Sequence, residues 1–282
     1  MNKKLGYTYK INLVTLLLAF IYPTPNAFAN NWILIDNFES QSSLSSWIKA
    51  DTKNDTSPKI PNPQITKRSF EPDKDNYYLI KKPAADGIIG NRKALTYKSL
   101  PVPVNVGETY TFYTRINVES FPNNHAFGIS NMSAEDIEQN DYNAFEPTLR
   151  VTDKKESNGK VNTGALMVKV VGDYANIQNH ALQKDANPLI PGSWYQIWYV
   201  VNNANKSQGG QVYDVYFKGG DEFPIQTKVF SNATFRMARE LPLIAFLMNC
   251  NTGSKKAPYG NGGLKYDDLY MIKGVNLSDP TI

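Results

Sequence analysis

Short segments in which apolar and polar residues alternate recur along most of this chain, and clusters of Gly, Pro, Asn and Asp separate them. The clearest are "TYTFYTRINV" (Thr109–Val118), "TLRVT" (Thr148–Thr152), "ALMVKVV" (Ala165–Val171) and "LKYDDLYMI" (Leu264–Ile272). A period of two is typical of strands that are buried on one side. The pattern therefore predicts an all-β protein, a β-sandwich of two antiparallel sheets. It adds one helical turn at Ser133–Gln139 and a long surface loop at Lys49–Asp75.

Alternation also assigns the two faces of each strand. In the first of these segments the even positions face the core, while Tyr113, Arg115 and Asn117 line the opposite face. The same rule turns Arg150 and Lys169 away from their apolar neighbours. One face of a sheet is therefore predicted to collect all five of these side chains as a ligand-binding surface.

The first 29 residues have the three parts of a secretory leader. Three lysines open the chain, the apolar run "INLVTLLLAFIY" (Ile11–Tyr22) follows, and Ala27–Ala29 has the small-residue pattern of a cleavage site. The apolar run is too short to span a bilayer. We predict that residues 1–29 are removed and that residues 30–282 form a single domain. The mature protein is then secreted or periplasmic and has no membrane span.

The net charge bears on which partners the chain can bind, and its cysteine content bears on how the fold is stabilised. The formal charge of the chain is +4, and removal of a leader with three lysines and no acid leaves 27 basic against 26 acidic residues. This balance gives no indication of a nucleic-acid partner. Cys250 is the only cysteine, so the chain forms no internal disulfide and relies on a large core or a bound metal. We expect a monomer.

The two ends of the predicted mature chain resemble a known family. "WILIDNFES…LSSW" (Trp32–Trp47) and "YDDLYMIKGVNLSDP" (Tyr266–Pro280) are similar to the opening and closing segments of secreted concanavalin A-like jelly rolls. Laminin-G-like domains and carbohydrate-binding modules of bacterial polysaccharide-degrading systems share that architecture. The resemblance implies a jelly-roll β-sandwich with adjacent first and last strands, and a polysaccharide or cell-surface glycan as partner.

That adjacency implies a metal site. It would bring Asp36 and Glu39 near Asp267 and Asp268, and gathered carboxylates need compensation. Related carbohydrate-binding modules carry a structural calcium ion at this place, and Ca²⁺ takes several oxygen ligands. Alternation turns Asp268 rather than Asp267 inward with Tyr266, so Asp36, Glu39 and Asp268 are the predicted Ca²⁺ ligands. The alternative is that these acids are hydrogen-bonded turn and edge groups without a metal.

Sugar binding needs an aromatic side chain that stacks on a pyranose and a few polar groups for its hydroxyls. The predicted sheet face supplies both. Aromatic residues in predicted loops add further candidates: Trp47, Tyr142 and Tyr259. We therefore predict a non-catalytic polysaccharide-binding protein.

A polysaccharide lyase acting on uronic-acid polymers such as alginate is the alternative. β-Elimination needs a cation or amide to neutralise the uronate carboxylate and a base for the C5 proton. The same face supplies the cations, and His125 and His180 are candidate bases. Gln178–His180 is similar to the Q-(I/V)-H of alginate-lyase jelly rolls, whereas "FEPTLRV" differs from their R-(S/T)-E-L. The E-x-D-x-x-E strand of glucanase jelly rolls is absent, as are H-E-x-x-H and G-x-S-x-G motifs, which disfavours the corresponding hydrolases.

Overall fold

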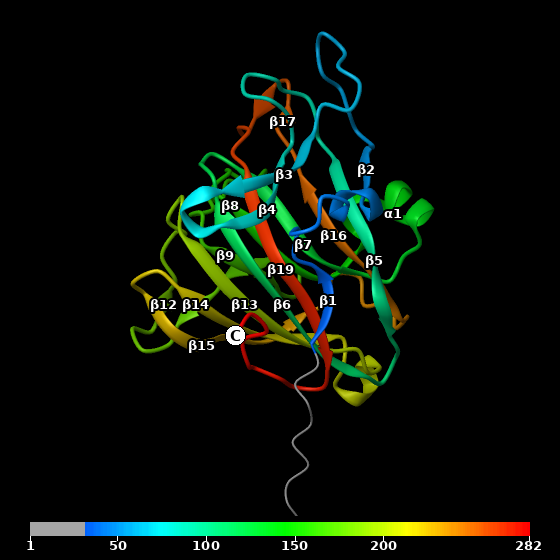
Figure 1. Cartoon of the computed structure of the whole chain (residues 1–282), viewed down its shortest axis with the longest axis vertical. Coiled ribbons are helices and arrows are strands. Elements are labelled where there is room, and N and C mark those ends of the chain that lie inside the picture. Colours follow the sequence, from blue (N-terminus) through cyan, green and yellow to red (C-terminus); the bar gives the residue numbers. More distant parts are fainter. Residues whose placement is uncertain (1–31) are drawn as a thin grey trace, which may run out of the picture. The chain divides into compact units, whose positions relative to one another are not determined.

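The alternating segments form two antiparallel sheets that pack face to face around a shared apolar core (Figure 1). The computed structural model describes residues 32–282, which form one compact unit. The predicted leader and the predicted first mature residue, Asn30, lie outside the described residues. Within residues 32–282, no helix has the length and apolar character needed to cross a membrane.

The first sheet contains eight strands in the order β15-β14-β13-β6-β19-β4-β3, and β1 also pairs with β19. Its strands are β1 (Ile33–Asp36), β3 (Ile65–Glu71), β4 (Asn76–Lys82), β6 (Thr109–Val118), β13 (Trp194–Asn202), β14 (Val212–Gly219), β15 (Phe223–Thr234) and β19 (Leu264–Lys273).

The second sheet contains seven strands in the order β10-β9-β8-β7-β16-β5-β2. Its strands are β2 (Ile48–Asp51), β5 (Ala94–Val104), β7 (Asn124–Ser130), β8 (Phe145–Thr152), β9 (Leu166–Lys169), β10 (Tyr174–Asn176) and β16 (Leu243–Cys250). Two small hairpins are β11 (Gln178–Asn179) with β12 (Lys184–Asp185) and β17 (Gly253–Ser254) with β18 (Ala257–Pro258). The helical elements are α1 (Ala134–Asn140) and the 3-10 turns η1 (Ser43–Ser46), η2 (Pro72–Lys74), η3 (Asp141–Ala144) and η4 (Lys206–Gln208).

Alternation decides which residues enter the core. Phe112 and Ile116 of β6 point inward as predicted and meet Phe127 and Leu149 from the second sheet in one buried cluster. Each fully buried side chain of this size stabilises the fold by about 1.5–3 kcal/mol. The predicted sandwich of two antiparallel sheets is thus confirmed.

The adjacency of the first and last strands is also confirmed, and with it the jelly-roll architecture implied by the resemblance. β1 runs antiparallel to β19, from Ile33 opposite Met271 to Asp36 opposite Leu269. Figure 1 shows β1 in blue beside β19 in red.

The helical turn predicted at Ser133–Gln139 is present as α1. The Ser133 hydroxyl accepts a hydrogen bond from the Asp136 amide at 3.2 Å and donates to its carboxylate at 2.7 Å. A serine at this position satisfies an amide that the first helical turn leaves without a partner.

The prediction of one long loop at Lys49–Asp75 is wrong, because β3 lies within it. β3 pairs with β4 from Ile65 opposite Lys82 to Glu71 opposite Asn76. The strand is rich in polar residues because it lies at the edge of the sheet, where charged side chains are tolerated. Backbone hydrogen bonds to β4 therefore make this segment a strand, although its side chains do not alternate between apolar and polar.

The two adjacent aspartates of β19 sit at a β-bulge. The register between β19 and β6 shifts between Asp267 and Tyr270, and Asp268 has a φ of 50°. Both carboxylates therefore reach Arg115, with Oδ2 of Asp267 2.6 Å from Nη2 and Oδ2 of Asp268 2.5 Å from Nε. The prediction that Asp268 alone points inward is wrong, because the extra residue of a bulge breaks strict alternation.

The predicted calcium ligands have other partners. Asp36 Oδ2 accepts hydrogen bonds from Trp47 Nε1 and Lys98 Nζ, each at 2.8 Å. Lys98 belongs to β5 of the second sheet, so this partly buried ion pair connects the two sheets. The Asp36 carboxylate is therefore neutralised by a lysine.

Glu39 and Asp268 do not complete a cation site with Asp36. Glu39 Oε1 accepts the Tyr77 amide at 3.0 Å, and Asp268 is paired with Arg115. Among residues 32–282 there is no group of three or more His, Cys, Asp or Glu side chains placed to hold a metal ion. The observed arrangement therefore does not fit Ca²⁺, which needs several converging oxygen ligands.

The Asp267–Asp268 pair predicts a pH-dependent stability. Burial raises the pKa of Asp267, and the Asp268 carboxylate raises it further than Arg115 lowers it. The pKa of Asp267 is about 7 in the folded state and about 3.9 in the unfolded chain. Between these two values the folded state keeps a proton that the unfolded chain has lost. The free energy of unfolding therefore falls as pH rises from about 4 to about 7. We expect Asp267→Asn to flatten this fall in thermal melts from acid to neutral pH. The exposed Asp73→Asn control should follow the wild type, and parallel curves for all three proteins would refute the prediction.

The partnered carboxylates predict that calcium does not stabilise the fold. A ligand raises the melting temperature only if it binds the folded state. We expect melting curves recorded with a chelator and with millimolar Ca²⁺ to coincide. A melting temperature that increases with Ca²⁺ and loses that increase in Glu39→Gln would contradict this expectation.

Candidate functional site

The structure divides the five predicted ligand-binding residues between two surfaces. Tyr113, Arg115 and Asn117 lie on β6 in the first sheet, whereas Arg150 lies on β8 and Lys169 on β9 in the second. The prediction that one face collects all five is therefore wrong. Period-two alternation gives the face of a residue relative to its own strand and leaves open which sheet the strand joins.

On the first sheet these side chains already have partners within the protein. Tyr113 is 1% exposed and packs its ring against Trp198 at a centroid distance of 5.0 Å. The Trp198 indole in turn donates to the carbonyl of Ser278 at 2.9 Å, so the C-terminal segment covers this part of the sheet. Asn117 is fully buried and donates to the carbonyl of Gly192 at 2.7 Å.

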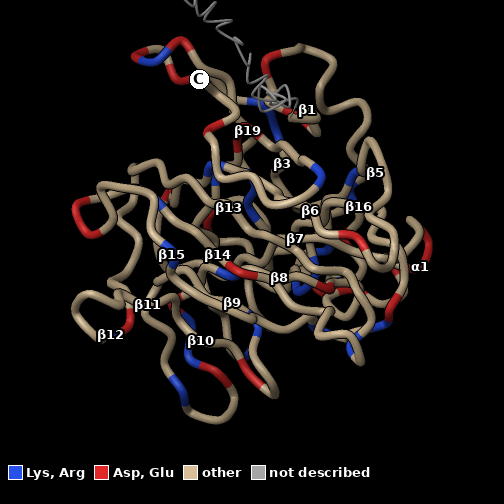
Figure 2. Tube along the Cα trace, turned by 90° about the horizontal axis from the view of Figure 1, so that it is seen from below, with Lys and Arg blue, Asp and Glu red and all other residues tan. Residues whose placement is uncertain are grey.

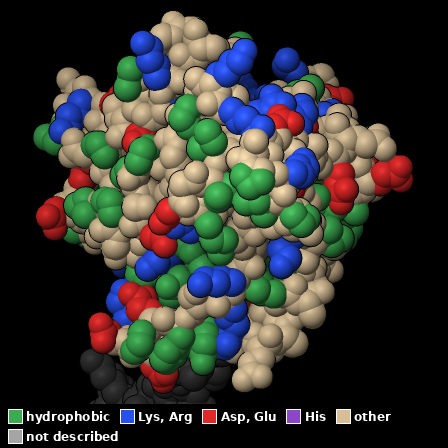
Figure 3. All heavy atoms as spheres, turned by 90° about the horizontal axis from the view of Figure 1, so that it is seen from above, with side chains coloured by type: hydrophobic (Ala, Val, Ile, Leu, Met, Phe, Trp, Pro, Cys, Tyr) green, Lys and Arg blue, Asp and Glu red, His purple; other side chains and the backbone are tan. Residues whose placement is uncertain are grey.

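On the second sheet the outer face is hollowed into a pocket of about 400 Å³. Strands β7, β8 and β16 form its floor, and the segments before β5, after β8 and around β17–β18 contribute to its walls. The cationic side chains that line it are Arg92, Lys93, Arg150 and Lys154. Figure 3 views the end of the sandwich that carries β17, where Lys and Arg side chains gather toward one side.

The floor of the pocket is a row of three residues on adjacent strands. Asn249 of β16 lies opposite Ala126 of β7, and Ala126 lies opposite Arg150 of β8. Neighbouring strands are about 4.8 Å apart, so the two polar residues are separated by about 10 Å. The small alanine between them leaves room for a ligand.

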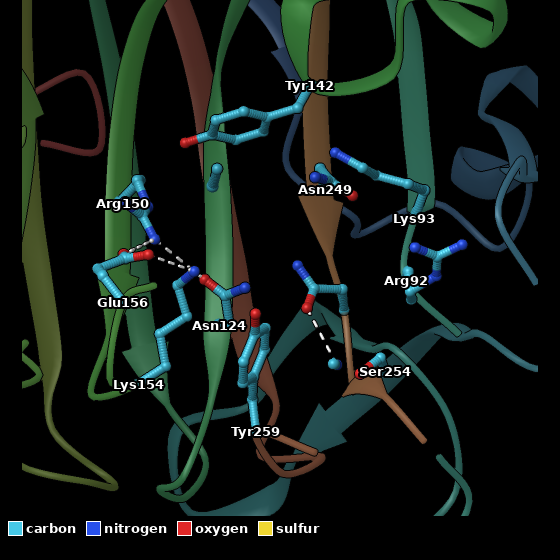
Figure 4. A pocket seen from close by; sticks show the side chains of 13 residues that line it. Arg92, Lys93, Asn124, Tyr142, Arg150, Lys154, Glu156, Asn249, Ser254 and Tyr259 are labelled. Atoms are coloured by element: carbon cyan, nitrogen blue, oxygen red, sulfur yellow. Dashed lines mark hydrogen bonds and ion pairs between the residues drawn. The ribbon is translucent and has the colours of Figure 1, made fainter. Parts of the chain in front are cut away.

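Arg150 is fixed by a set of polar and aromatic contacts. Its Nη2 donates to Glu156 Oε1 at 3.0 Å and to Asn124 Oδ1 at 3.3 Å (Figure 4). The guanidinium carbon lies 4.7 Å from the centre of the Tyr174 ring. Lys169 shares this ring at 5.5 Å, so the structure brings Arg150 and Lys169 together, although only Arg150 lines the pocket.

Lys93 is the cation of the pocket without an ion-pair partner among residues 32–282. Its amine points across the pocket toward Tyr142 and Asn249 (Figure 4), and lies 5.1 Å from the Tyr142 ring centre. Burial lowers the pKa of Lys93 from about 10.5 to about 8, and the Asp141 carboxylate offsets only part of this effect. The side chain can therefore change its protonation state near neutral pH.

Asn249 presents an unused polar group to the pocket. The residue is 3% exposed, and its Oδ1 has no hydrogen-bond partner within the described part of the chain. This oxygen is free to accept a hydrogen bond from a ligand or an ordered water. A sugar hydroxyl or a protonated carboxyl group would satisfy Oδ1.

Two of the three predicted loop aromatic residues reach the pocket. Tyr142 lies on η3 and donates its hydroxyl proton to the Tyr174 hydroxyl at 2.8 Å. Tyr259 follows β18, and its ring centre is 4.8 Å from Lys154 Nζ. Trp47, in contrast, is buried in the core.

The two histidines lie outside the pocket. His125 is buried on the inward side of β7, where its Nε2 lies 2.9 Å from the carbonyl of Gly262. Burial lowers its pKa to about 3, so the ring is neutral and inaccessible. His180 is exposed in the turn between β11 and β12. Neither histidine is placed to act as a base on a ligand of the pocket.

Sequence reasoning missed most of the pocket lining, above all Lys93, Asn124, Asn249 and Glu156. Asn124 begins β7 and Asn249 lies near the end of β16. Each lies an even number of residues from outward-facing neighbours on its strand, and this period-two spacing is a signal that the sequence contains. Lys93 and Glu156 lie in connecting segments, whose direction no periodicity reports.

Comparison with known proteins gives structural likeness at low identity. No protein-family model matches the chain, and nothing among the curated proteins matches it. An alginate lyase from Aplysia kurodai is 11% identical, with 74% of this chain and 87% of that chain covered and a TM-score of 0.46. A β-glucanase catalytic domain from Podospora anserina is 10% identical, with 87% and 86% covered and a TM-score of 0.45.

A third similar structure is the exoplasmic/lumenal domain of VIP36 in a Ca²⁺- and Man3GlcNAc-bound form. It is 8% identical, with 86% of this chain and 89% of that chain covered and a TM-score of 0.42. The likeness concerns the fold alone.

Proposed function

We propose that this chain binds an acidic polysaccharide in the pocket on the outer face of the second sheet. The observation that carries the proposal is the convergence of Arg150, Lys93 and the unpartnered amide oxygen of Asn249 on one cavity of about 400 Å³, where the cations can bind a carboxylate and the oxygen can accept a sugar hydroxyl. Guanidinium and ammonium groups bind carboxylates through charge-assisted hydrogen bonds. A uronate unit supplies such a carboxylate beside its hydroxyls.

The excess of cations in the pocket is local. Its lining holds four cationic side chains and one acid, whereas the whole chain without the predicted leader is close to neutral. Figure 2 shows Lys and Arg interspersed with Asp and Glu along much of the chain. A cleft lined by one sign of charge raises the local concentration of an oppositely charged ligand.

Aromatic side chains supply the apolar part of sugar recognition. Tyr142 and Tyr259 flank the polar floor, and both present rings at the pocket (Figure 4). Aromatic faces pack against the C–H side of a pyranose, while the polar groups orient its hydroxyls. Export through the predicted leader would place the protein where extracellular polysaccharides occur.

β-Elimination at the same pocket is a second candidate function, and Lys93 is the observation that favours it. Its neutral amine would take the C5 proton of a uronate whose carboxylate contacts Arg150 and Asn249. The C5–H electron pair then forms the C4–C5 double bond as the bond from C4 to the glycosidic oxygen breaks. That oxygen leaves with a proton from a tyrosine or from water.

The proposed binding is tested by measuring how much protein is retained on acidic and on neutral polysaccharides. Ultraviolet absorbance is followed in the same samples, because it detects the unsaturated product of a lyase. We expect retention on uronic-acid polymers and loss of about tenfold or more in affinity for Arg150→Ala, since a charge-assisted hydrogen bond contributes about 1.5–3 kcal/mol. Lys228→Ala removes one cation outside the pocket and should retain wild-type affinity. Equal retention of acidic and neutral polymers, or full affinity of Arg150→Ala, would refute the proposal.

The pH dependence separates binding from lyase action. If Lys93 only attracts the polymer, affinity should fall as pH rises through about 8, because the amine loses its charge. If Lys93 is the base, formation of the unsaturated, ultraviolet-absorbing product should instead rise through that pH. Lys93→Arg keeps the charge and removes the titrating amine, so it should preserve binding and abolish turnover. Turnover that survives in Lys93→Arg would exclude Lys93 as the base.

A further inference from the structure

One acid lies among the cations of the pocket. Glu156 is in the connection between β8 and β9, and it is the acidic residue among the described residues that line the cavity. Its Oε1 accepts hydrogen bonds from Arg150 Nη2 at 3.0 Å and from Asn162 Nδ2 at 2.9 Å. Its Oε2 lies 2.6 Å from Lys154 Nζ. Two cations and one amide thus surround a single planar carboxylate. Figure 4 shows the two cations, Arg150 and Lys154, beside it.

The donors around Glu156 are held by other parts of the fold. Arg150 projects from β8, next to Asn124 of β7, and is buried. Asn162 is also buried, and its Nδ2 donates to the carbonyl of Lys154 at 3.1 Å. Arg150 and Asn162 therefore keep these contacts when the Glu156 carboxylate moves away, and Lys154 Nζ keeps its contact with the Tyr259 ring at 4.8 Å.

The backbone around Glu156 is also fixed independently of its side chain. The Glu156 amide donates to the carbonyl of Lys160 at 2.7 Å, and the Asn162 amide donates to that of Lys154 at 3.1 Å. Lys155 and Val161 form a bridge across the same turn. Rotation about the side-chain bonds of Glu156 is therefore enough to withdraw its carboxylate, and the loop need not unfold.

We propose that the Glu156 carboxylate occupies a subsite for a uronate carboxylate, and that the polymer displaces it to reach Arg150 and Lys154. This inference rests on the proposed function. One uronate of the bound polymer lies at Lys93, and a second uronate of the same polymer occupies the Glu156 subsite. Arg150 and Lys154 already contact the two oxygens of the Glu156 carboxylate, one each. A uronate carboxylate has the same planar pair of oxygens and can make the same two contacts.

Displacement by a carboxylate gives the pocket a selectivity. A uronate restores the two ion pairs that it breaks, and Glu156 moves into solvent. A neutral sugar that displaces Glu156 leaves two cations without a partner, and unpaired charges away from water are costly. Glu156 therefore discriminates against neutral polysaccharides and lowers the affinity for acidic ones by competing with them.

The test is calorimetric titration of the full protein and its Glu156→Gln variant with a tetragalacturonate and a neutral tetrasaccharide. Glutamine keeps the size of the side chain and removes the competing charge. We expect Glu156→Gln to bind the oligouronate about tenfold more tightly, which is the loss of one charged competitor. Glu108→Gln changes the net charge equally but lies at an ion pair with Lys273 outside the pocket, and should match the wild type.

A second variant tests whether the tighter oligouronate binding of Glu156→Gln arises at the subsite. Adding Lys154→Ala to Glu156→Gln should remove most of the tightening, because the oligouronate then lacks the ammonium partner. Unchanged or weaker binding by Glu156→Gln, in a protein that still loses the oligouronate on Arg150→Ala, would refute the subsite and leave the proposed function standing. Absence of oligouronate binding by both the wild type and Glu156→Gln would refute the two together.

Discussion

Burial of alternate residues between the two sheets is the constraint on which the pocket depends. Phe127 and Leu149 occupy inward positions on neighbouring strands, and the apolar area they bury holds those strands in register. Because successive residues of a strand point to opposite faces, Ala126, Arg150 and Asn249 are forced outward in one row. A register slip of one residue would place the arginine in the core, at a cost of several kcal/mol for an unpaired charge.

Each sheet carries an outward arginine whose charge is neutralised in a different way. Arg115 is paired with Asp267 and Asp268, which belong to the adjacent strand and cannot leave without disrupting the bulge. Arg150 is paired with Glu156, which a loop supplies. The first arrangement is a fixed part of the sheet, whereas the second leaves a cation that a ligand can take over. The same chemistry thus has a structural role on one sheet and a binding role in the proposed function of the other.

The pattern of the sequence predicted the sandwich, the inward and outward faces of β6 and β8 and the helical turn of α1, and the family resemblance of the two ends implied the pairing of the end strands. It did not predict β3, because an edge strand needs no apolar alternation to pair through its backbone. It also grouped Tyr113 with Arg150, which lie on different sheets. Sheet membership depends on long-range pairing between segments that are far apart in the chain, and side-chain periodicity carries no record of it.

The sequence by itself determined the local facts of its alternating segments: that they form strands, which face most of their residues take, and that Arg150 points away from the core. Only the tertiary structure decided that Lys93, Asn249 and Tyr259 surround Arg150 on one cavity. These residues come from segments separated by many strands, and three of the walls are loops without a repeating pattern. Their convergence results from strand order and loop packing, which are properties of the whole fold, whereas alternation is a property of each strand alone.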